Sequence, residues 1–409
     1  MKRLLSVFLG VLTAIGGFVD IGDLVANSLA GARFGLSLVW VTLLGVVGIC
    51  LFAEMSGRVA AVTHRGTFDL VRERLGPRAG LLNLVASVLV TVLTFTAEIG
   101  GVALALELAT SVNYLLFVPV VGFAVWLVIW RMRFEVLENV FGLLGLALVV
   151  FAVALWKLNP AWGDLLHAIV VPHKPASEDL STYLYYGVAL FGAAMTPYEV
   201  FFFSSGAVEE RWTAKDIPTS RINVFIGFPL GGLLSVAIAA CAALVLMPQG
   251  IEVGTLGQVG LPVAVAVGKL GLAVAILGFF AATFGAALET GLSTGYSIAQ
   301  YFGWQWGKFV RPQQAARFHV VVLLALIASI AGVLTTADPI KVTEYSIVFS
   351  AVALPLTYFP ILVVANDPVY MGEHVNGRLS NVLGTVFLGV ILVVAVAAIP
   401  LMLLTAAGQ

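Results

Sequence analysis

Long apolar runs separated by short polar breaks dominate this chain. A membrane-spanning helix needs about 20 apolar residues to cross about 30 Å of hydrocarbon, and eleven runs approach that length. The runs begin near Leu4, Leu36, Leu81, Tyr114, Leu137, Leu180, Val224, Pro262, Val320, Tyr345 and Asn381. The pattern therefore predicts an all-α polytopic membrane protein with 11 transmembrane helices.

Three segments depart from this simple pattern. The first run has a basic start like a signal peptide, but it continues past Asp20 to Ala32, which favours a full span. The eighth run extends to Phe302 and would be about 60 Å long as one helix, so we expect a break or an overhang there. The longest hydrophilic stretch, residues 160–179, is predicted to be a loop.

Composition agrees with a membrane protein and excludes several functions. The 409 residues are 60% hydrophobic and 11% charged, whereas soluble chains carry about 25% charged residues. A net charge of −1 leaves no basic field for nucleic acid. The two cysteines lie in apolar runs and form no metal-binding or disulfide pattern. No hydrolase or phosphate-loop motif is present, so we do not expect the chain to be an enzyme or to bind a cofactor. We expect it to be surrounded by membrane lipid and to have no obligate protein partner.

The basic residues predict how the chain is oriented. With a cytoplasmic N-terminus, 16 of the 21 lysines and arginines fall in cytoplasmic segments, as the positive-inside rule requires. The outside segments hold only Arg33, Lys157, Lys174, Lys269 and Lys341. An odd number of helices then places the C-terminus outside the cell, in a multi-pass protein of the inner (plasma) membrane.

Two helices contain breaks where polar residues lie among apolar ones. The first break is Gly-Gly-Phe-Val-Asp-Ile-Gly-Asp over residues 16–23, and the second is Gly-Ala-Ala-Met-Thr-Pro-Tyr over residues 192–198. Pro197 has no N–H to bond the carbonyl four residues earlier, so it should free the oxygen of Ala193. Backbone groups left free in the membrane indicate a cavity or a site.

The two breaks are five spans apart, which indicates two five-helix halves related by inverted topology. Paired broken helices in corresponding positions of two halves indicate a transporter's central site. The expected division is residues 1–158 for helices 1–5, residues 159–179 for an extracellular loop, residues 180–366 for helices 6–10, and residues 367–409 for helix 11 and the C-terminus.

Asp20 and Asp23 suggest what that site binds. Carboxylates near the bilayer centre cost several kcal/mol unless they are paired or hydrated, and two of them three residues apart repel each other. A bound cation removes both costs. Two alternatives remain open, because the glycines could serve helix packing and Asp23 could cap the unwound segment.

Ordered motifs along residues 10–375 resemble the NRAMP family of divalent-metal transporters. The matching positions are Asp20-Ile-Gly22-Asp23, Ala30-Gly31-Ala32 with Phe34-Gly35, Arg72-Glu73-Arg74, Ala97-Glu98, Thr294-Gly295 with Gln300, Leu354-Pro355, Pro360, Asp367 and Met371-Gly372. Pro197-Tyr198 and Phe201-Phe202-Phe203 resemble its magnesium-transporter branch. The resemblance implies a LeuT-like fold, with helices 1 and 6 unwound at mid-membrane.

The resemblance also implies a ligand set. Carried over by position, the metal ligands are Asp20, Asp23, the carbonyl of Ala193, and Thr196. The family's asparagine is Asp23 in this chain, and its methionine is Thr196. Loss of a thioether and gain of a carboxylate favour a hard dication, so Mg²⁺ is the expected substrate and Mn²⁺ a plausible one.

Proton coupling is not expected. The family's helix 6 histidines fall on Tyr198 and Phe203, and its helix 3 aspartate falls on Phe95; none of these titrates near neutral pH. Of the residues that the resemblance assigns to proton transfer, only Glu98 is present in this chain.

Several polar residues have both a functional and a structural interpretation. Tyr198, Glu98 and Glu289 could line the ion path or its surroundings. Thr196 could instead bond a carbonyl of its own helix, Tyr198 could be a packed aromatic residue, and Glu98 could anchor helix 3 to helix 1. Glu289 could be protonated and merely hydrogen-bonded.

The competing function is a Na⁺- or H⁺-coupled transporter of amino acids or other organic solutes with the same fold. Such a transporter uses helix N-termini to hold a substrate carboxylate. The two acidic residues of helix 1 argue against it, because they would repel an anionic group.

Overall fold

The computed structural model describes residues 2–335 and 338–408, and every regular element assigned in them is a helix. The principal helices are α1 (Lys2–Gly17), α2 (Ile21–Phe34), α3 (Val39–Thr63), α4 (Thr67–Leu75), α5 (Pro77–Thr110), α6 (Val118–Arg131), α7 (Phe134–Gly145), α8 (Val150–Leu158), α9 (Trp162–Val170), α10 (Leu180–Ala194), α11 (Pro197–Glu209), α12 (Ile217–Ile222), α13 (Phe228–Val245), α14 (Leu256–Val267), α15 (Lys269–Phe302), α16 (Ala316–Thr335), α17 (Pro339–Ala365), α18 (Pro368–Met371) and α19 (Arg378–Leu404).

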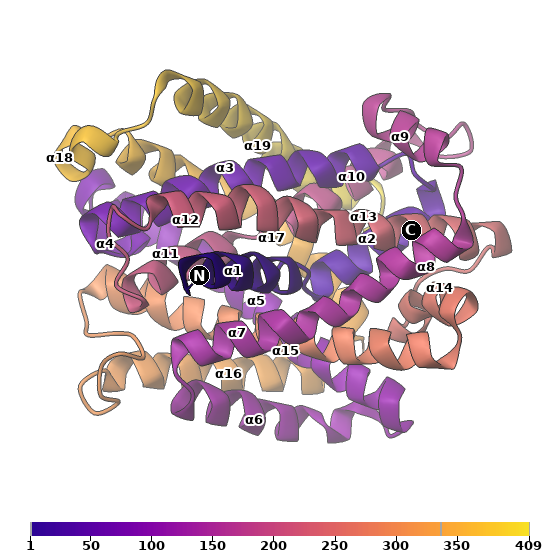
Figure 1. Ribbon diagram of the computed structural model, residues 1–409, viewed down its shortest axis with the longest axis horizontal. Coiled ribbons are helices and arrows are strands. Elements are labelled where there is room, and N and C mark those ends of the chain that lie inside the picture. Colours follow the sequence, from indigo (N-terminus) through magenta and orange to yellow (C-terminus); the bar gives the residue numbers. More distant parts are fainter. Residues whose placement is uncertain (1, 336–337, 409) are drawn as a thin grey trace.

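The long helices lie roughly side by side along the long axis of the molecule (Figure 1). Within the described residues, nine helices or continuous helix pairs are long and apolar enough to cross a membrane, and the bent pair of α1 and α2 makes a tenth. The shorter apolar helix α6 takes the place of the predicted fourth span. The predicted all-helical membrane fold is confirmed. α4 and α18 lie at the end where α1 begins, hereafter the amino-terminal end, and α9 and α14 lie at the opposite end (Figure 1).

Two predictions about individual segments need correction. The predicted eighth span began near Pro262, but α14 ends at Val267 and α15 starts at Lys269. Gly268 separates them with φ of 81°, a conformation that glycine adopts without strain. The expected break is therefore real, and the span itself starts later. The predicted loop of residues 160–179 contains the short helix α9, which is amphipathic enough to form at the protein surface.

The first span is broken between α1 and α2, which meet at an angle of 61°. Asp20 ends the break with an extended backbone and caps α2, because its side chain accepts a hydrogen bond from the N–H of Asp23. α1 is held against α7 by close backbone packing: a Cβ on Gly16 would lie 1.8 Å from the carbonyl oxygen of Gly142. Glycine at this position therefore lets the two helices approach.

The second break separates α10 from α11. α10 ends at Ala194, and Thr196 precedes α11 with an extended backbone. Pro197 occupies the first position of α11, where a missing N–H costs nothing. The sequence therefore breaks this helix at the predicted place.

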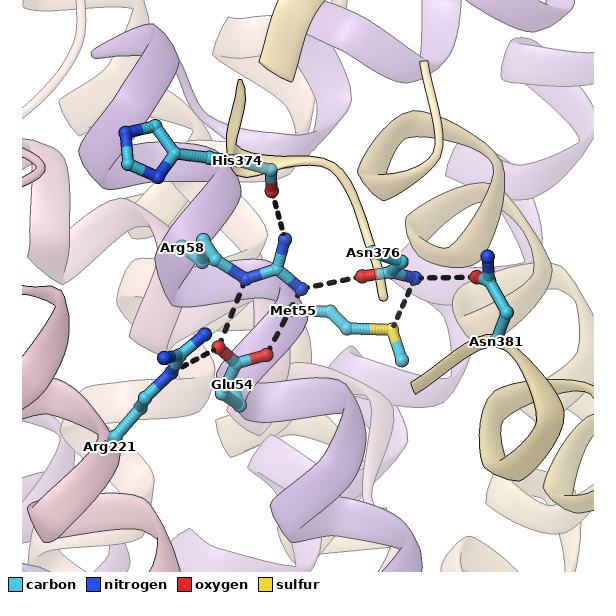
Figure 2. Close-up of polar contacts among 7 residues, drawn as sticks. All are labelled: Glu54, Met55, Arg58, Arg221, His374, Asn376 and Asn381. Carbon is cyan, nitrogen blue, oxygen red and sulfur yellow. Dashed lines mark hydrogen bonds and ion pairs between the residues drawn. The ribbon is translucent and has the colours of Figure 1, made fainter. Parts of the chain in front are cut away.

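A buried ion-pair network joins three segments at the amino-terminal end (Figure 2). The Arg58 guanidinium donates to both carboxylate oxygens of Glu54, at 3.0 and 3.1 Å, and also to the carbonyl of His374 and the side chain of Asn376, each at 2.5 Å. Arg221, at the end of α12, donates to Glu54 at 2.9 Å. The network ties α3 to α12 and to the segment between α18 and α19.

Candidate metal site

Asp20 ends the first break and its side chain reaches the second one. Its Oδ1 accepts the N–H of Asp23 at 2.8 Å, and its Oδ2 accepts the hydroxyl of Tyr198 at 3.1 Å. Asp20 is 2% exposed. The hydroxyl of Tyr198 therefore contacts the predicted ligand while its side chain is buried, and both interpretations of this residue are compatible with that contact.

Asp23 lies one helical turn further along and is 1% exposed. Its Oδ1 accepts hydrogen bonds from Asn27 of the same helix and from Ser235 of α13, both at 3.3 Å. The suggestion that Asp23 caps the unwound segment is wrong, because the capping carboxylate is that of Asp20. The Asp20 carboxylate accepts the N–H of Asp23, so two acidic residues lie together at the start of α2, and repulsion between such carboxylates favours a cation between them.

Thr196 lies between α10 and α11 rather than inside a helix. Its buried hydroxyl makes no well-formed hydrogen bond to any described residue, so the alternative in which it bonds a carbonyl of its own helix is wrong. Ala193 is buried near the end of α10, and position 197 offers no N–H to its carbonyl. Thr196 and Asp20 line one small cavity, whereas Ala193 and Asp23 do not line it.

Glu98 of α5 approaches the break from a third direction. Its Oε1 accepts the N–H of Ile21 at 3.3 Å. This bond joins α5, the predicted third span, to α2 of the first span, and it is the anchoring contact that the sequence left open. Its other oxygen is buried without a hydrogen-bond partner in the described part of the chain. This orphaned oxygen is free to accept a proton, a water molecule or an ion.

A larger cavity of about 1000 Å³ extends from the break toward the amino-terminal end. Its lining includes Gly17 of α1, Glu199 of α11 and Glu289 of α15, together with Arg211 and Asp216 from the segment between α11 and α12. The acidic lining residues number seven and the basic ones three, so its potential favours cations. Burial lowers the pKa of the Lys308 amine on this wall to about 8. We call this cavity the acidic vestibule.

The structure brings some predicted residues together and leaves others apart. Asp20, Asp23, Thr196, Tyr198 and Glu98 surround the two breaks, whereas Glu289 faces the vestibule, where its Oε1 lies 4.0 Å from the place of a Cβ on Gly17. Within residues 2–335 and 338–408, there is no group of three or more His, Cys, Asp or Glu side chains placed to hold a metal ion. An ion at the breaks would therefore depend on hydroxyl, carbonyl and water oxygens as well as the two carboxylates.

Sequence reasoning missed several polar residues around the site. They are Asn27, Ser235, Thr94, Thr343, Ser346 and Ser350, together with Glu138 in the vestibule. Only Asn27 had a usable signal, since it lies four residues after Asp23 and so on the same face of the helix.

A membrane-spanning helical bundle in which two helices, five spans apart, break at one buried polar point has the architecture of the LeuT-fold transporters. Residues 10–400 match the family described as natural resistance-associated macrophage protein-like, and this chain belongs to that family.

Related sequences agree over nearly the whole chain. A divalent metal cation transporter MntH from Erwinia tasmaniensis is 26% identical over 394 residues, covering 92% of this chain and 89% of the relative. A protein of the same name from Klebsiella pneumoniae is 25% identical over 390 residues, with the same coverage of both chains.

Solved structures share the fold at lower sequence identity. A manganese transporter from Eremococcus coleocola superposes with a TM-score of 0.72 at 18% identity, covering 95% of this chain and 84% of the other. The nucleobase-cation-symport-1 family transporter Mhp1 gives a TM-score of 0.62 at 14% identity, covering 98% and 92%. These likenesses support the fold alone.

Proposed function

We propose that this protein transports a divalent metal cation, with Mg²⁺ as the preferred ion and Mn²⁺ as a second substrate. The observation that carries the proposal is the pair of buried carboxylates, Asp20 and Asp23, at the break of the first span. The names of the related MntH proteins and of the Eremococcus coleocola transporter support a divalent metal as the class of substrate.

The chemistry around the break favours a hard ion. The candidate ligands Asp20, Asp23, Thr196 and the Ala193 carbonyl offer oxygen only, and thioether sulfur is missing from that set. Oxygen ligands suit Mg²⁺, Mn²⁺ and Ca²⁺, whereas thioether ligands select softer metals. Met195 is next in sequence, but its sulfur lies 2.6 Å from the place of a Cβ on Gly48 of α3 and so packs against that helix.

Replacing Thr196 by methionine should shift the ion preference. We expect Thr196→Met to weaken Mg²⁺ binding about tenfold relative to Mn²⁺, because a thioether cannot replace a hard oxygen ligand. Isothermal titration of Mg²⁺, Mn²⁺ and Ca²⁺ against purified protein measures this ratio. Thr357→Val is the matched control, since Thr357 is a buried threonine that bonds its own helix. An unchanged ratio in Thr196→Met would show that the ligand atom at position 196 does not set the preference for a hard ion.

We also propose that the inward movement of the ion is driven by the membrane potential and is not coupled to protons. Phe95, Tyr198 and Phe203 cannot accept a proton near neutral pH, so of the residues that the resemblance assigns to proton transfer only Glu98 remains. Two charges moving inward at −100 mV gain about 4.6 kcal/mol.

Vesicles containing the protein should therefore accumulate Mn²⁺ under an inside-negative potential with no change in internal pH. A fluorescent metal indicator and a pH indicator in the same vesicles measure both quantities. Metal-dependent acidification of the lumen would contradict the proposal.

Transport requires that the ion reach both sides of the membrane in turn. The acidic vestibule lies on the amino-terminal side of the first break and is lined by Gly17 but by none of Asp20, Asp23 and Thr196, while the cavity that Asp20 lines has a volume of only about 10 Å³. With a cytoplasmic N-terminus, the vestibule would lie on the cytoplasmic side of the site. Rocking of the two proposed repeats, residues 1–158 and 180–366, would expose the opposite side.

The organic-solute alternative is weaker. A substrate carboxylate at the N-terminus of α2 would meet Asp20, which already caps that helix end. The cavity of about 10 Å³ beside it has room for about one water molecule.

A further inference from the structure

Five hydroxyl side chains gather around the cavity beside Asp20. The cavity is lined by Thr94 of α5, by Thr196, and by Thr343, Ser346 and Ser350 of α17, and its volume of about 10 Å³ is close to the space that one water molecule needs. All five residues are buried. No residue that lines this cavity also lines the acidic vestibule.

Three of the five hydroxyls already donate their protons, which leaves their oxygen lone pairs for the cavity. Thr343 donates to the carbonyl of Pro339 at 2.9 Å, and Thr94 donates to the carbonyl of Val90 at 3.0 Å. Since Thr94 has one proton, Ser346 is the donor in their contact at 2.8 Å. A hydroxyl that has donated its proton still has lone pairs that accept hydrogen bonds. The hydroxyl of Thr196 is buried and makes no well-formed bond to a described residue.

Such a set of acceptors matches the needs of water bound to a metal ion. The oxygen of a metal-bound water faces the ion, so both of its hydrogens point outward and require acceptors. Mg²⁺ gives up its water reluctantly and usually keeps several molecules. Ile347 also faces this point, because its methyl carbon lies 3.0 Å from the place of a Cβ on Gly22, and it offers no ligand atom.

We infer that the hydroxyls of Thr94, Thr343, Ser346 and Ser350 hold a water molecule bound to the transported ion, and that they favour Mg²⁺ through its retained hydration. This inference rests on the proposed function, since it concerns the ion at Asp20. The hydroxyls act as positioning residues that do not touch the ion.

The double variant Thr343→Val with Ser346→Ala tests the inference. Proteoliposomes at a fixed membrane potential give the KM for Mg²⁺ and for Mn²⁺ uptake. Loss of groups that orient the surroundings of a metal typically costs about 10- to 100-fold in affinity, so we expect the KM for Mg²⁺ to rise at least about tenfold. Mn²⁺, which dehydrates more readily, should change by less than about threefold.

Thr357→Val is the control, because Thr357 is buried on the same helix, bonds a carbonyl of that helix and does not line the cavity. Single variants Thr343→Val and Ser346→Ala keep the test available if the double variant fails to fold. Equal changes for both ions, or none, would overturn the inference while leaving the proposed function intact. A wild-type protein that transports neither ion, or Mn²⁺ alone, would overturn the proposed preference and the inference with it.

Discussion

Replacing Asp20 by asparagine should abolish high-affinity binding of divalent ions. The substitution removes one of the two carboxylates at the break, and we expect affinity to fall at least about 100-fold, which corresponds to about 2.7 kcal/mol. Asparagine caps helices as well as aspartate does, so α2 should remain capped and the protein should remain folded. Isothermal titration with Mn²⁺ and Mg²⁺ measures the loss.

Asp164→Asn provides the matched control, because Asp164 lies exposed on α9 and lines neither the cavity beside Asp20 nor the acidic vestibule. Its affinity should equal that of the wild type. If Asp20→Asn bound both ions as tightly as Asp164→Asn, Asp20 would not be a ligand.

Replacing Glu54 by alanine should cause the largest loss of stability. The substitution leaves the Arg58 guanidinium, whose side chain is 5% exposed, without its counter-charge (Figure 2). Removing one partner of a buried ion pair costs about 3–5 kcal/mol. The free energy of unfolding in mixed detergent micelles measures the effect.

The exposed pair of Arg65 and Glu73 supplies the comparison. Their side chains are 37% and 42% exposed, and exposed ion pairs contribute about 0–1 kcal/mol, so Glu73→Ala should have little effect. The double variant of Glu54→Ala with Arg58→Met should regain part of the loss, because no buried charge remains. Equal effects of Glu54→Ala and Glu73→Ala would show that the buried network does not stabilise the fold.

The spans and both breaks could be predicted from the sequence for simple physical reasons. About 20 apolar residues are needed to cross a bilayer, and the backbone tolerates breaks there only at particular residues such as Gly17 and Pro197. The start of the eighth span was misplaced because the apolar run continues through Gly268, whose positive φ separates α14 from α15. Hydrophobicity alone does not report that turn.

The surroundings of the site could be predicted only in part. The resemblance pointed to Asp20 and Tyr198, which lie 178 residues apart in sequence and are in contact. It gave no indication of Ser235, which bonds Asp23 across 212 residues. Hydroxyl residues in apolar helices commonly bond their own backbone, so Thr343 and Ser346 had no sequence feature that distinguished them from Thr357. Their shared cavity becomes visible only when α5 and α17 are packed together.

We expect a divalent ion to bind where the two broken helices meet. Crystals of the protein soaked in Mn²⁺ and measured at the manganese absorption edge locate the ion directly. The wild-type protein should give one strong anomalous peak within about 2.0–2.6 Å of carboxylate oxygens of Asp20 and Asp23, and this peak should be absent in Asp20→Asn. A strong peak in the acidic vestibule beside Glu138 or Glu199, with none at the break, would contradict it.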